Sequence, residues 1–383
     1  MNKLKVLIVI DSLGSGGAER STQVLCDYLA RVQVPFEIIC LDKRSIGVQQ
    51  DMLSKGYTIH FLDHLSFLKQ VSYIATVIHE KAITVVHSVL FRSNLRVRLC
   101  KLKAKFVHLE SLVNTTYSEQ RFLDPKVNKL GLRLYKMIDK LTANKFVDHF
   151  HSITDAVKHH YVEQLNIPSN KITVIYRGRN AAKVSPKDSM QEFGVNKSDF
   201  IVVNTGRHEF QKGQLQLLKA FKLLAEKGFT DVKLIILGRD GTCTKEMKTF
   251  VSQNNLNASV CLAGYRHDVP EILRSCNLFA FSSFYEGLGG AVIEAQAAGL
   301  PIACNNIDVL REVVKVGQNA ALFDSLDVSS IAKTIEFFYK SPESCAKYGI
   351  KSRENFEANF DLEVVHEKML QLYQKLGKHN SIN

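Results

Sequence analysis

Three features that often reveal a protein's class are missing from this chain of 383 residues. Its eight cysteines form no C-x-x-C pair and show no cysteine–histidine spacing typical of zinc. No D-x-D triad occurs, so paired carboxylates that would hold a divalent cation are not indicated. No apolar run approaches the roughly 20 residues that a membrane-spanning helix needs. We therefore expect reduced thiols, a cytoplasmic location and no bound metal.

The composition that remains is typical of a globular protein. Hydrophobic residues make up 45% of the chain and charged residues 23%. A chain of this length is too long for one ordinary core, so we expect two domains. The apolar stretch after the basic amino terminus is too short for a signal peptide and leads into Asp11 and a glycine turn. We interpret it as a first β-strand.

Strand-like and helix-like patterns alternate from one end of the chain to the other. The apolar runs that we interpret as strands are Val6–Ile10, Phe36–Leu41, Val85–Val86, Lys105–His108, Ile172–Tyr176, Phe200–Asn204, Val232–Leu237, Val260–Ala263 and Leu278–Phe281. Continuous apolar strands separated by helices are typical of parallel sheets that are buried on both faces. The sequence therefore predicts an α/β protein.

The pattern restarts after about residue 180, which predicts two Rossmann-like domains facing a cleft. We place the N-terminal domain at residues 1–180, the C-terminal domain at residues 181–360, and a helix with a tail at residues 361–383. The polar stretch from Ala181 to Val195 is interpreted as the linker between the domains. Residues 362–376 form one amphipathic helix, which we expect to return to the N-terminal domain.

The net charge of +12 is concentrated in the first half of the chain. Residues 1–180 hold 26 Lys and Arg against 15 Asp and Glu, whereas residues 181–383 hold 24 against 23. The excess is greatest within residues 92–145, which contain 13 basic and 4 acidic side chains. We expect this half to meet an anionic partner: a membrane surface, an anionic acceptor molecule or, less favoured, nucleic acid.

One segment of this basic half has the pattern of an amphipathic helix. Its basic residues recur at helical spacing: Lys126, Lys129, Arg133, Lys136 and Lys140. Apolar residues recur on another face: Val127, Leu130, Leu134, Ile138 and Leu141. Such helices lie on anionic membranes. The alternative is a surface helix whose apolar face packs on the sheet while its basic face is solvated.

Two glycine-containing loops follow predicted strands. Gly14 to Gly17 follow the first strand, where glycine lets the backbone approach a ligand and the next helix offers its N-terminus to an anion. A plain tight turn explains them equally well. The second loop, residues 206–213, places Arg207 and Lys212 before a helix that begins near Gln214. Two cations there suit a diphosphate, although exposed loop cations are common.

The most informative stretch is residues 280–304. Glu286 lies in a loop between a buried strand and a helix, and Glu294 projects from the first turns of that helix. Gly287 to Gly290 separate them, and Gly299 ends the helix. Carboxylates accept hydrogen bonds from vicinal hydroxyls, and a helix N-terminus favours negative charge. Because Glu294 lies among apolar residues, it needs a partner. The stretch predicts a site for a polyhydroxylated anion.

The motifs GR-x4-KG, at residues 206–213, and E-G-x-G-x4-EA-x-A-x-G-x-P, at residues 286–301, together resemble the family 4 retaining glycosyltransferases of GT-B fold. The sequence GGAER at residues 16–20 resembles the family's first loop on the donor side. Further segments match at residues 173–178, 262–266 and 310–314, so the resemblance covers nearly the whole chain.

This resemblance implies transfer of a hexose or N-acetylhexosamine, with retention, from a nucleoside-diphosphate sugar to a glycan or lipid-linked acceptor. UDP is the expected carrier, with GDP as the alternative. Glu294 would bind ribose, Glu286 would contact the transferred sugar, and Arg207 and Lys212 would hold the diphosphate. The remaining donor contacts would come from Gly16, Gly17, Tyr265, Arg266, Gly287, Leu288, Gly289 and Gly290. His108 resembles the acceptor-side histidine, with Glu110 as a rival.

The sequence departs from the family pattern at a few positions. Leu288 stands where the family usually has an aromatic residue, and Gln296 where it often has methionine. Arg177 and Arg179 replace a more usual Asn-Gly-x-Asp ending. These two arginines either touch the donor or face solvent.

The implied chemistry needs neither a metal nor another cofactor. Departure of the nucleoside diphosphate leaves negative charge, which Arg207, Lys212 and the following helix N-terminus are placed to stabilise. Glu286 is not expected to act as a nucleophile. Two other functions stay open: a sugar-nucleotide epimerase of similar fold, which needs no acceptor, and a polyanion-binding protein, which lacks recognition motifs. We expect the enzyme in the cytoplasm, with peripheral attachment to the inner membrane as a hypothesis.

Overall fold

The computed structural model describes residues 4–125, 127–180 and 184–379. Its residue contacts divide the chain into two compact units. The N-terminal unit contains the described residues up to Tyr117, Asn128–Gly178 and the segment from Leu362 onward. The C-terminal unit contains Ser118–Val127 and Arg179–Asp361. The chain therefore passes into the C-terminal unit after Tyr117 and again after Gly178, and it returns after Val127 and after Asp361.

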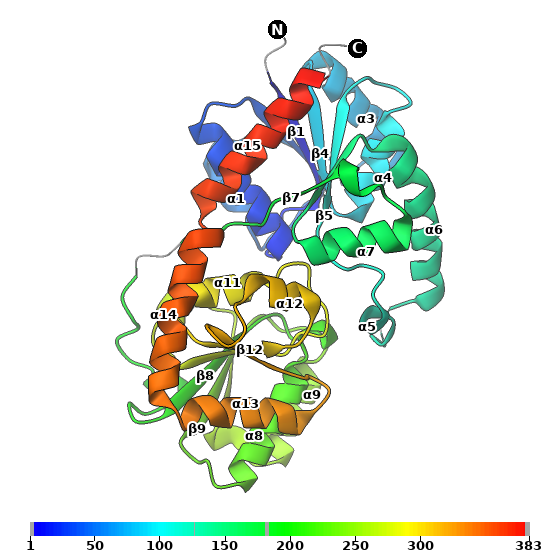
Figure 1. Cartoon of the computed structure of the whole chain (residues 1–383). Helices are drawn as coiled ribbons and strands as arrows, with labels where there is room; N and C mark the ends of the chain where they lie inside the picture. Colours follow the sequence, from blue (N-terminus) through cyan, green and yellow to red (C-terminus); the bar gives the residue numbers. More distant parts are fainter. Residues whose placement is uncertain (1–3, 126, 181–183, 380–383) are drawn as a thin grey trace. The chain divides into compact units, whose positions relative to one another are not determined.

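A seven-stranded parallel sheet forms the middle of the N-terminal unit, with the order β3-β2-β1-β4-β5-β6-β7 (Figure 1). The strands are β1 (Val6–Ser12), β2 (Phe36–Asp42), β3 (Ile59–Phe61), β4 (Val85–Val89), β5 (Val107–Leu112), β6 (His149–Ser152) and β7 (Ile172–Val174). β4 and β5 are buried along their whole length, and β1 is buried except at Asp11, because helices cover both faces.

The helices of this unit are α1 (Gly17–Arg31), α2 (Gln49–Ser54), α3 (Phe67–Glu80), α4 (Phe91–Cys100), α6 (Lys129–Phe146), α7 (Asp155–Leu165), the 3-10 turn η1 (Ser169–Lys171) and α15 (Leu362–His379). Successive side chains of β1 point to opposite faces of the sheet. Ile8 and Ile10 pack in a core with residues of α1 and α15, whereas Leu7 and Val9 pack with residues of α3 and α4.

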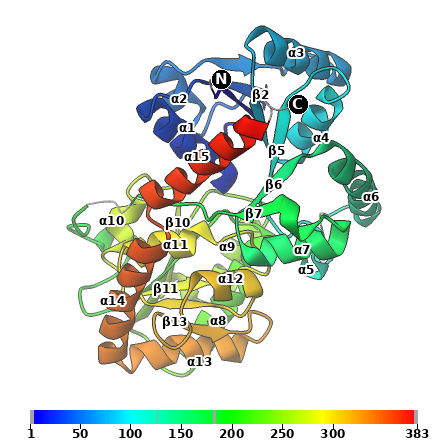
Figure 2. The same cartoon turned by 45° about the horizontal axis from the view of Figure 1, so that its top comes forward.

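The C-terminal helix α15 packs on the N-terminal unit, as the sequence predicts. Figures 1 and 2 both show α15 beside α1. Its apolar face contributes to the core on that side of the sheet through Val365, Met369, Leu372 and Leu376. Tyr373 of the same helix is fully buried and reaches into the polar interior of the sheet.

A chain of hydrogen bonds runs from α15 across three strands. The Tyr373 hydroxyl lies 2.6 Å from His87 Nδ1, and His87 Nε2 lies 2.7 Å from Ser111 Oγ. Ser111 Oγ lies 2.9 Å from His151 Nδ1, and His151 Nε2 lies 2.8 Å from the Ile175 carbonyl oxygen. All four side chains are buried, so the chain satisfies polar groups that would otherwise cost free energy in the core.

The C-terminal unit is built on a six-stranded parallel sheet with the order β10-β9-β8-β11-β12-β13. Its strands are β8 (Phe200–Thr205), β9 (Val232–Leu237), β10 (Val260–Gly264), β11 (Leu278–Phe281), β12 (Ile302–Asn305) and β13 (Ala320–Phe323). Its helical segments are α5 (Glu119–Phe122), η2 (Gln191–Phe193), η3 (Phe210–Lys212), α8 (Gln214–Glu226), α9 (Thr244–Gln253), η4 (Leu256–Ala258), α10 (Val269–Leu273), α11 (Gly290–Ala297), α12 (Asp308–Val313), α13 (Val328–Tyr339) and α14 (Pro342–Asn359).

Helices cover both faces of this sheet too. Residues of α8, α9 and α13 share one core with Val202 of β8 and Ala280 of β11. On the other face α11 contacts β11, β12 and α14. The two units are therefore both Rossmann-like, which confirms the α/β prediction.

The linker prediction is wrong over most of its length. Residues 181–183 lie outside the described part of the chain, but residues 184–195 belong to the C-terminal unit. Phe193 and Val195 are buried there, and the Lys187 backbone N–H donates to Ser275 Oγ at 2.7 Å. The polar composition misleads because Lys187 is neutralised by Asp268, at 2.7 Å, and by Glu192, at 3.0 Å.

Candidate functional site

The order of the strands in the C-terminal unit indicates where a ligand would bind. β8 and β11 lie side by side, and the chain runs outward from them in opposite directions, through β9 and β10 on one side and β12 and β13 on the other. In open parallel sheets, ligands bind at the carboxyl ends of the strands beside such a switch point. The two loops that begin there are residues 206–213, after β8, and residues 282–289, after β11. Both carry motifs that the sequence singles out.

The loop after β8 brings its backbone against the neighbouring strand. Gly213 has a φ of 59°, and a Cβ atom at this position would overlap the carbonyl oxygen of Ser282. The turn η3 leads through Lys212 into Gly213, and α8 begins at the next residue, as the sequence predicts. Arg207 is exposed and forms no ion pair with any residue that the structure describes. Its guanidinium is therefore available to an anion.

Hydrogen bonds join the two loops directly. Gln211 Nε2 donates to the Tyr285 carbonyl oxygen at 2.7 Å, and the Phe284 backbone N–H donates to the Gln211 carbonyl oxygen at 2.9 Å. Ser282 Oγ donates to the Lys212 carbonyl oxygen at 3.0 Å. These three hydrogen bonds thus tie the loops after β8 and β11 together. The sequence motifs contain no signal for the role of Gln211.

Lys212 and Glu286, which were predicted from two separate motifs, meet where these two loops join. Lys212 Nζ lies 2.6 Å from Glu286 Oε1, and the Glu286 side chain is only 10% exposed. The Lys212 ammonium also lies 5.4 Å from the centre of the Phe281 ring. A carboxylate and an ammonium group therefore stand together at the switch point, where one can accept hydrogen bonds from hydroxyls and the other can hold a phosphate.

Glu294 has the partner that its apolar helix requires, and that partner is Arg179. Arg179 Nε lies 3.0 Å from Glu294 Oε1. The Arg179 guanidinium also covers Gly290, because a Cβ atom at residue 290 would lie 2.5 Å from Arg179 Nη2. From the sequence, Arg179 was expected either to touch the donor or to face solvent. The signal that marked it was its departure from the family pattern.

The other predicted donor residues of this unit fall into two groups. Tyr265 follows β10, is partly exposed and has the Arg239 guanidinium 5.9 Å from its ring centre. Arg266 is held by Asp268, at 2.7 Å, and by Glu192, at 3.0 Å, and it lowers the pKa of the Asp268 carboxyl. The Tyr265 ring thus stays exposed, with the His267 ring edge-on to it at 4.9 Å between centres, while the Arg266 charge is already paired.

Between Glu286 and Glu294 the glycine-rich turn supports the site by packing. Leu288 is buried, so its side chain anchors the turn in the core. Gly289 has a φ of 75°, and a Cβ atom there would lie 2.7 Å from Leu310 Cδ2. Backbone groups of the turn, rather than its side chains, are therefore the groups that it can offer to a ligand.

The N-terminal unit has its own switch point, between β1 and β4. Gly16 is the N-cap of α1 and Gly17 its first residue, so both lie at the carboxyl end of β1. At the end of β4, Leu90 has a φ of 77° and a ψ of 154°, a strained conformation for leucine. Asp11 fixes this region, because its Oδ1 accepts from both the backbone N–H and the hydroxyl of Ser93 at 2.7 Å.

His108 and Glu110, the two candidates for the acceptor side, are both buried in the N-terminal unit. The predicted strand Lys105–His108 is displaced: β5 begins at Val107, so His108 lies at its amino end rather than its carboxyl end. His108 Nε2 lies 2.8 Å from Ser88 Oγ, and burial holds the pKa of His108 well below its usual range. In this structure its imidazole has no exposed surface with which to meet an acceptor.

Glu110 forms part of a buried charge cluster. Arg98 lies 2.8 Å and 2.5 Å from the two oxygens of Glu110, and 2.6 Å from Asp139 Oδ1. Burial raises the pKa of Glu110 to about 7 in spite of the neighbouring guanidinium. This arrangement is that of a core ion cluster, so the roles of His108 and Glu110 in binding an acceptor stay predictions.

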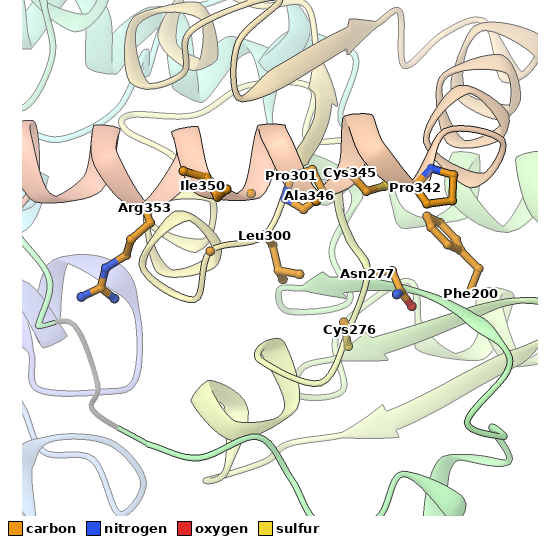
Figure 3. A pocket seen from close by; sticks show the side chains of 12 residues that line it. Phe200, Cys276, Asn277, Leu300, Pro301, Pro342, Cys345, Ala346, Ile350 and Arg353 are labelled. Carbon is orange, nitrogen blue, oxygen red and sulfur yellow. The ribbon is translucent and has the colours of Figure 1, made fainter.

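A hollow of about 600 Å³ lies elsewhere in the C-terminal unit (Figure 3). It is lined by Phe200, at the start of β8, by Asn277, just before β11, and by Ile350 and Arg353 of α14. These residues mark the amino ends of the strands, whereas ligands bind at the carboxyl ends. We therefore place the site at the loops joined by Lys212 and Glu286.

Helix α6 carries the basic amphipathic pattern. Its packing contradicts the alternative in which the apolar face of this helix lies on the sheet. Leu132, Asp139 and Ala143 are its buried residues. The predicted apolar residues Leu130, Leu134 and Leu141 are 76%, 51% and 67% exposed, and Met137 on the same stripe is 55% exposed. The alternative in which the apolar face packs on the sheet is therefore wrong for this stripe. Lys126 of the predicted basic face lies outside the described residues.

The described residues contain neither a membrane-spanning helix nor a cluster of metal ligands. Among them, no helix is both long enough and apolar enough to cross a membrane. Within the same residues, no group of three or more His, Cys, Asp or Glu side chains is placed to hold a metal ion. Catalysis without a metal stays a prediction.

Comparison with known proteins gives two family models that lie end to end on this chain. Residues 15–183 match the model described as Glycosyltransferase Family 4, and residues 185–355 match the model described as Glycosyl transferases group 1. The boundary between the two matches falls within a few residues of the crossing after Gly178.

Curated relatives match about half of the chain or nearly the whole of it. The chain is 28% identical over 180 residues to the UDP-Gal:alpha-D-GlcNAc-diphosphoundecaprenol alpha-1,3-galactosyltransferase of Escherichia coli, which covers 45% of the chain and 46% of that protein. It thus spans about half the length of this relative. It is 24% identical to the capsular polysaccharide biosynthesis glycosyltransferase CapH of Staphylococcus aureus, over 97% of the chain and 98% of CapH.

Among solved structures, HepE of Anabaena in complex with UDP and glucose superposes with a TM-score of 0.84 at 18% identity. The superposition covers 97% of this chain and 100% of HepE. The two Rossmann-like units are therefore those of the GT-B fold. The two family models, which together cover residues 15–183 and 185–355, show that the chain belongs to family 4 of the glycosyltransferases.

Proposed function

We propose that the protein is a retaining, metal-independent glycosyltransferase that moves a hexose or N-acetylhexosamine from a UDP-sugar to a glycan or lipid-linked glycan. The product would serve cell-surface polysaccharide or glycolipid synthesis. The observation that carries the proposal is the meeting of Lys212 Nζ and Glu286 Oε1, 2.6 Å apart, at the β8/β11 switch point. Two sequence motifs 74 residues apart thereby supply one site.

The chemistry of these groups suits a sugar nucleotide. Exposed Arg207 and the N-terminus of α8 would hold the diphosphate, and Lys212 would exchange its carboxylate partner for a phosphate oxygen when the donor binds. Glu286 would then be released to accept hydrogen bonds from the sugar hydroxyls. As the bond to the leaving diphosphate breaks, the cations would stabilise the charge that develops on it.

Relatives support the classes of donor and acceptor. HepE has been crystallised with UDP and with UDP-glucose. The printed name of the Escherichia coli relative specifies a UDP-sugar donor and a diphosphoundecaprenol-linked acceptor. The acceptor in this name favours a glycosyltransferase over an epimerase, because an epimerase needs no acceptor.

The experiment that tests the donor is a panel of sugar nucleotides scored by thermal shift and by slow hydrolysis. UDP-sugars are expected to raise the melting temperature, with at least one hydrolysed, and Glu286→Gln is expected to slow hydrolysis more than about tenfold. Stabilisation by GDP-sugars alone would reject UDP as the carrier, and stabilisation by none would reject the donor site. Epimer formation from the donor alone would favour the epimerase.

Retention and metal independence need separate tests. Once a donor is identified, the anomeric configuration of the product is read by NMR, and the proposal predicts the same configuration as in the donor. Turnover is expected to persist in EDTA, because Arg207, Lys212 and a helix N-terminus supply the positive charge. Inversion, or loss of turnover that Mg²⁺ or Mn²⁺ restores, would contradict the corresponding part of the proposal.

We also propose that the enzyme attaches to the anionic inner face of the membrane through α6. The exposed stripe of Leu130, Leu134, Met137 and Leu141 recurs at intervals of three and four residues, so it forms one line along the helix. Exposed basic side chains flank it: Lys129, Arg133, Lys140 and Lys145. An apolar line beside cations is the pattern of helices that lie in a membrane interface.

Flotation with liposomes tests this attachment. The protein is expected to float with vesicles that contain phosphatidylserine and to stay in the soluble fraction with neutral phosphatidylcholine vesicles. Equal recovery with the two lipids would contradict the proposal.

A further inference from the structure

We propose that Arg179 is a positioning residue: it fixes the Glu294 carboxylate so that this carboxylate can bind the ribose hydroxyls of the donor. The inference rests on the proposed function and names the residue that makes the donor site prefer ribose to deoxyribose. It follows from three observations on Arg179: its ion pair, its place over Gly290 and the anchoring of its backbone.

The ion pair holds one of the two carboxylate oxygens. Arg179 Nε lies 3.0 Å from Glu294 Oε1, with the side chains 15% and 30% exposed. Oε2 of Glu294 has no side-chain or backbone partner in the described ranges 4–125, 127–180 and 184–379. A carboxylate with one oxygen bound to arginine keeps its other oxygen in a fixed direction, where it can accept from a diol.

Gly290 provides the space that this arrangement needs. Gly290 and Glu294 are four residues apart in α11, so they lie on the same face of the helix. A Cβ atom on residue 290 would lie 2.5 Å from Arg179 Nη2 and 3.4 Å from Arg179 Cζ. The Nη2 end of the guanidinium therefore lies over the first turn of α11, and any side chain at residue 290 would displace it.

The backbone of Arg179 is anchored where the long segment Arg179–Asp361 of the C-terminal unit begins and ends. The Arg179 N–H donates to the Phe360 carbonyl oxygen at 3.0 Å, and Arg179 forms a parallel bridge with Asp361. The side chain thus projects from a fixed backbone position. Preorganisation of this kind lets a positioning residue orient its neighbour before the ligand arrives.

Equilibrium binding of UDP and of 2′-deoxy-UDP, measured by calorimetry, tests the role without an acceptor or a known sugar. GDP and 2′-deoxy-GDP are measured in parallel. The natural protein is expected to prefer the ribose form by about tenfold or more, since a site built to bind a hydroxyl rejects an analogue that lacks it. Arg179→Ala is expected to weaken UDP binding about tenfold and to reduce the preference to below about threefold.

Three further variants separate positioning from general stability. Gly290→Ala keeps Arg179 but places a methyl group where the Arg179 guanidinium lies. It is therefore expected to lower the ribose preference as Arg179→Ala does. Added to Arg179→Ala, it is expected to change the preference little further, because no guanidinium is left to displace. Arg274→Ala, an exposed arginine of the same unit that lies outside the proposed site, is the matched control and is expected to keep the preference.

Each outcome bears on the inference. A full ribose preference in Arg179→Ala, with or without a lower melting temperature, would overturn it and leave Arg179 as a structural residue. Equal binding of the ribose and deoxyribose forms by the natural protein would also overturn it. If the natural protein binds neither UDP nor GDP, the proposed donor site itself fails, and the inference fails with it.

Discussion

The attachment of α6 to anionic membranes can be tested by removing apolar surface from the helix while keeping its fold. The variant is Leu130→Gln with Leu141→Gln, because Leu and Gln have similar helix propensities. Full burial of a leucine side chain stabilises by about 1.5–3 kcal/mol. With 76% and 67% of these side chains exposed before binding, the pair is expected to contribute about 2–4 kcal/mol to membrane binding. The lower value corresponds to a loss of about thirtyfold in the partition coefficient.

The basic side chains give this prediction a second signature. A Lys or Arg near an anionic leaflet contributes about 1 kcal/mol, so the exposed Lys129, Arg133 and Lys140 would add about 3 kcal/mol. This contribution is screened by salt, whereas the apolar contribution is not. Binding to vesicles with phosphatidylserine is therefore expected to weaken at high salt in the natural protein. The glutamine variant is expected to bind weakly at every salt concentration.

A matched control decides whether the loss is specific to α6. Leu68 and Leu326 are 71% and 68% exposed, which is close to the exposure of the two α6 leucines, and they lie elsewhere on the chain. Leu68→Gln with Leu326→Gln removes a similar apolar area and is expected to leave flotation unchanged. Equal losses in the two double variants, with circular dichroism showing both folded, would refute the reasoning that α6 is the membrane surface.

Three further predictions follow from the site and the core. Glu286→Gln and Lys212→Ala are each expected to reduce turnover more than about tenfold, a loss of about 1.4 kcal/mol in transition-state stabilisation, without unfolding; near-normal turnover of either variant would remove that residue from the site. Arg98→Met leaves Glu110 and Asp139 buried without their cation and is expected to lower the free energy of unfolding in urea by about 3–5 kcal/mol; a loss below about 1 kcal/mol would contradict this account of the cluster. Burial lowers the pKa values of His151 and His160 to about 4, below the 6.5 of an unfolded chain, so the unfolded state takes up protons first as the pH falls. The free energy of unfolding is therefore expected to be greatest above pH 6.5 and to decline toward pH 4, and a urea midpoint that stays constant from pH 7 to pH 4.5 would contradict it.

The long apolar strands were predictable because their composition alone favours a doubly buried position. β9 and β11 match the predicted ranges residue for residue. Short strands of mixed character were missed. β6 reads His-Phe-His-Ser, and β3 has only three residues, Ile-His-Phe. Such segments become strands through pairing with β5 and β2, a tertiary effect that no local pattern carries.

The candidate site was predictable in its location but not in its pairing. The motifs place Lys212 and Glu286 in loops that follow strands, and a parallel sheet brings such loops to one edge. That the two side chains form an ion pair depends on β8 and β11 being neighbours, which is a property of the strand order. The partner of Glu294 was likewise not predictable, because Arg179 lies 115 residues away in sequence.

The direction in which α6 faces was also beyond the sequence. Its pattern shows two faces, basic and apolar, but periodicity does not say which face meets the protein. The structure buries a third face, which contains Leu132, Asp139 and Ala143. Asp139 faces inward, where it binds Arg98 and the Tyr117 hydroxyl, so a polar residue occupies the buried face of the helix.

The hydrogen-bond chain from Tyr373 to Ile175 has a fixed polarity. The Ile175 carbonyl oxygen can only accept, so His151 Nε2 carries the proton and its Nδ1 must accept from the Ser111 hydroxyl. Ser111 in turn accepts from His87 Nε2, whose Nδ1 accepts from the Tyr373 hydroxyl. One carbonyl group thereby sets the tautomers of two histidines and the orientation of two hydroxyls. The last residue of this hydrogen-bond chain, Tyr373, belongs to α15. The position of each proton between the C-terminal helix and Ile175 is therefore set by the Ile175 carbonyl oxygen.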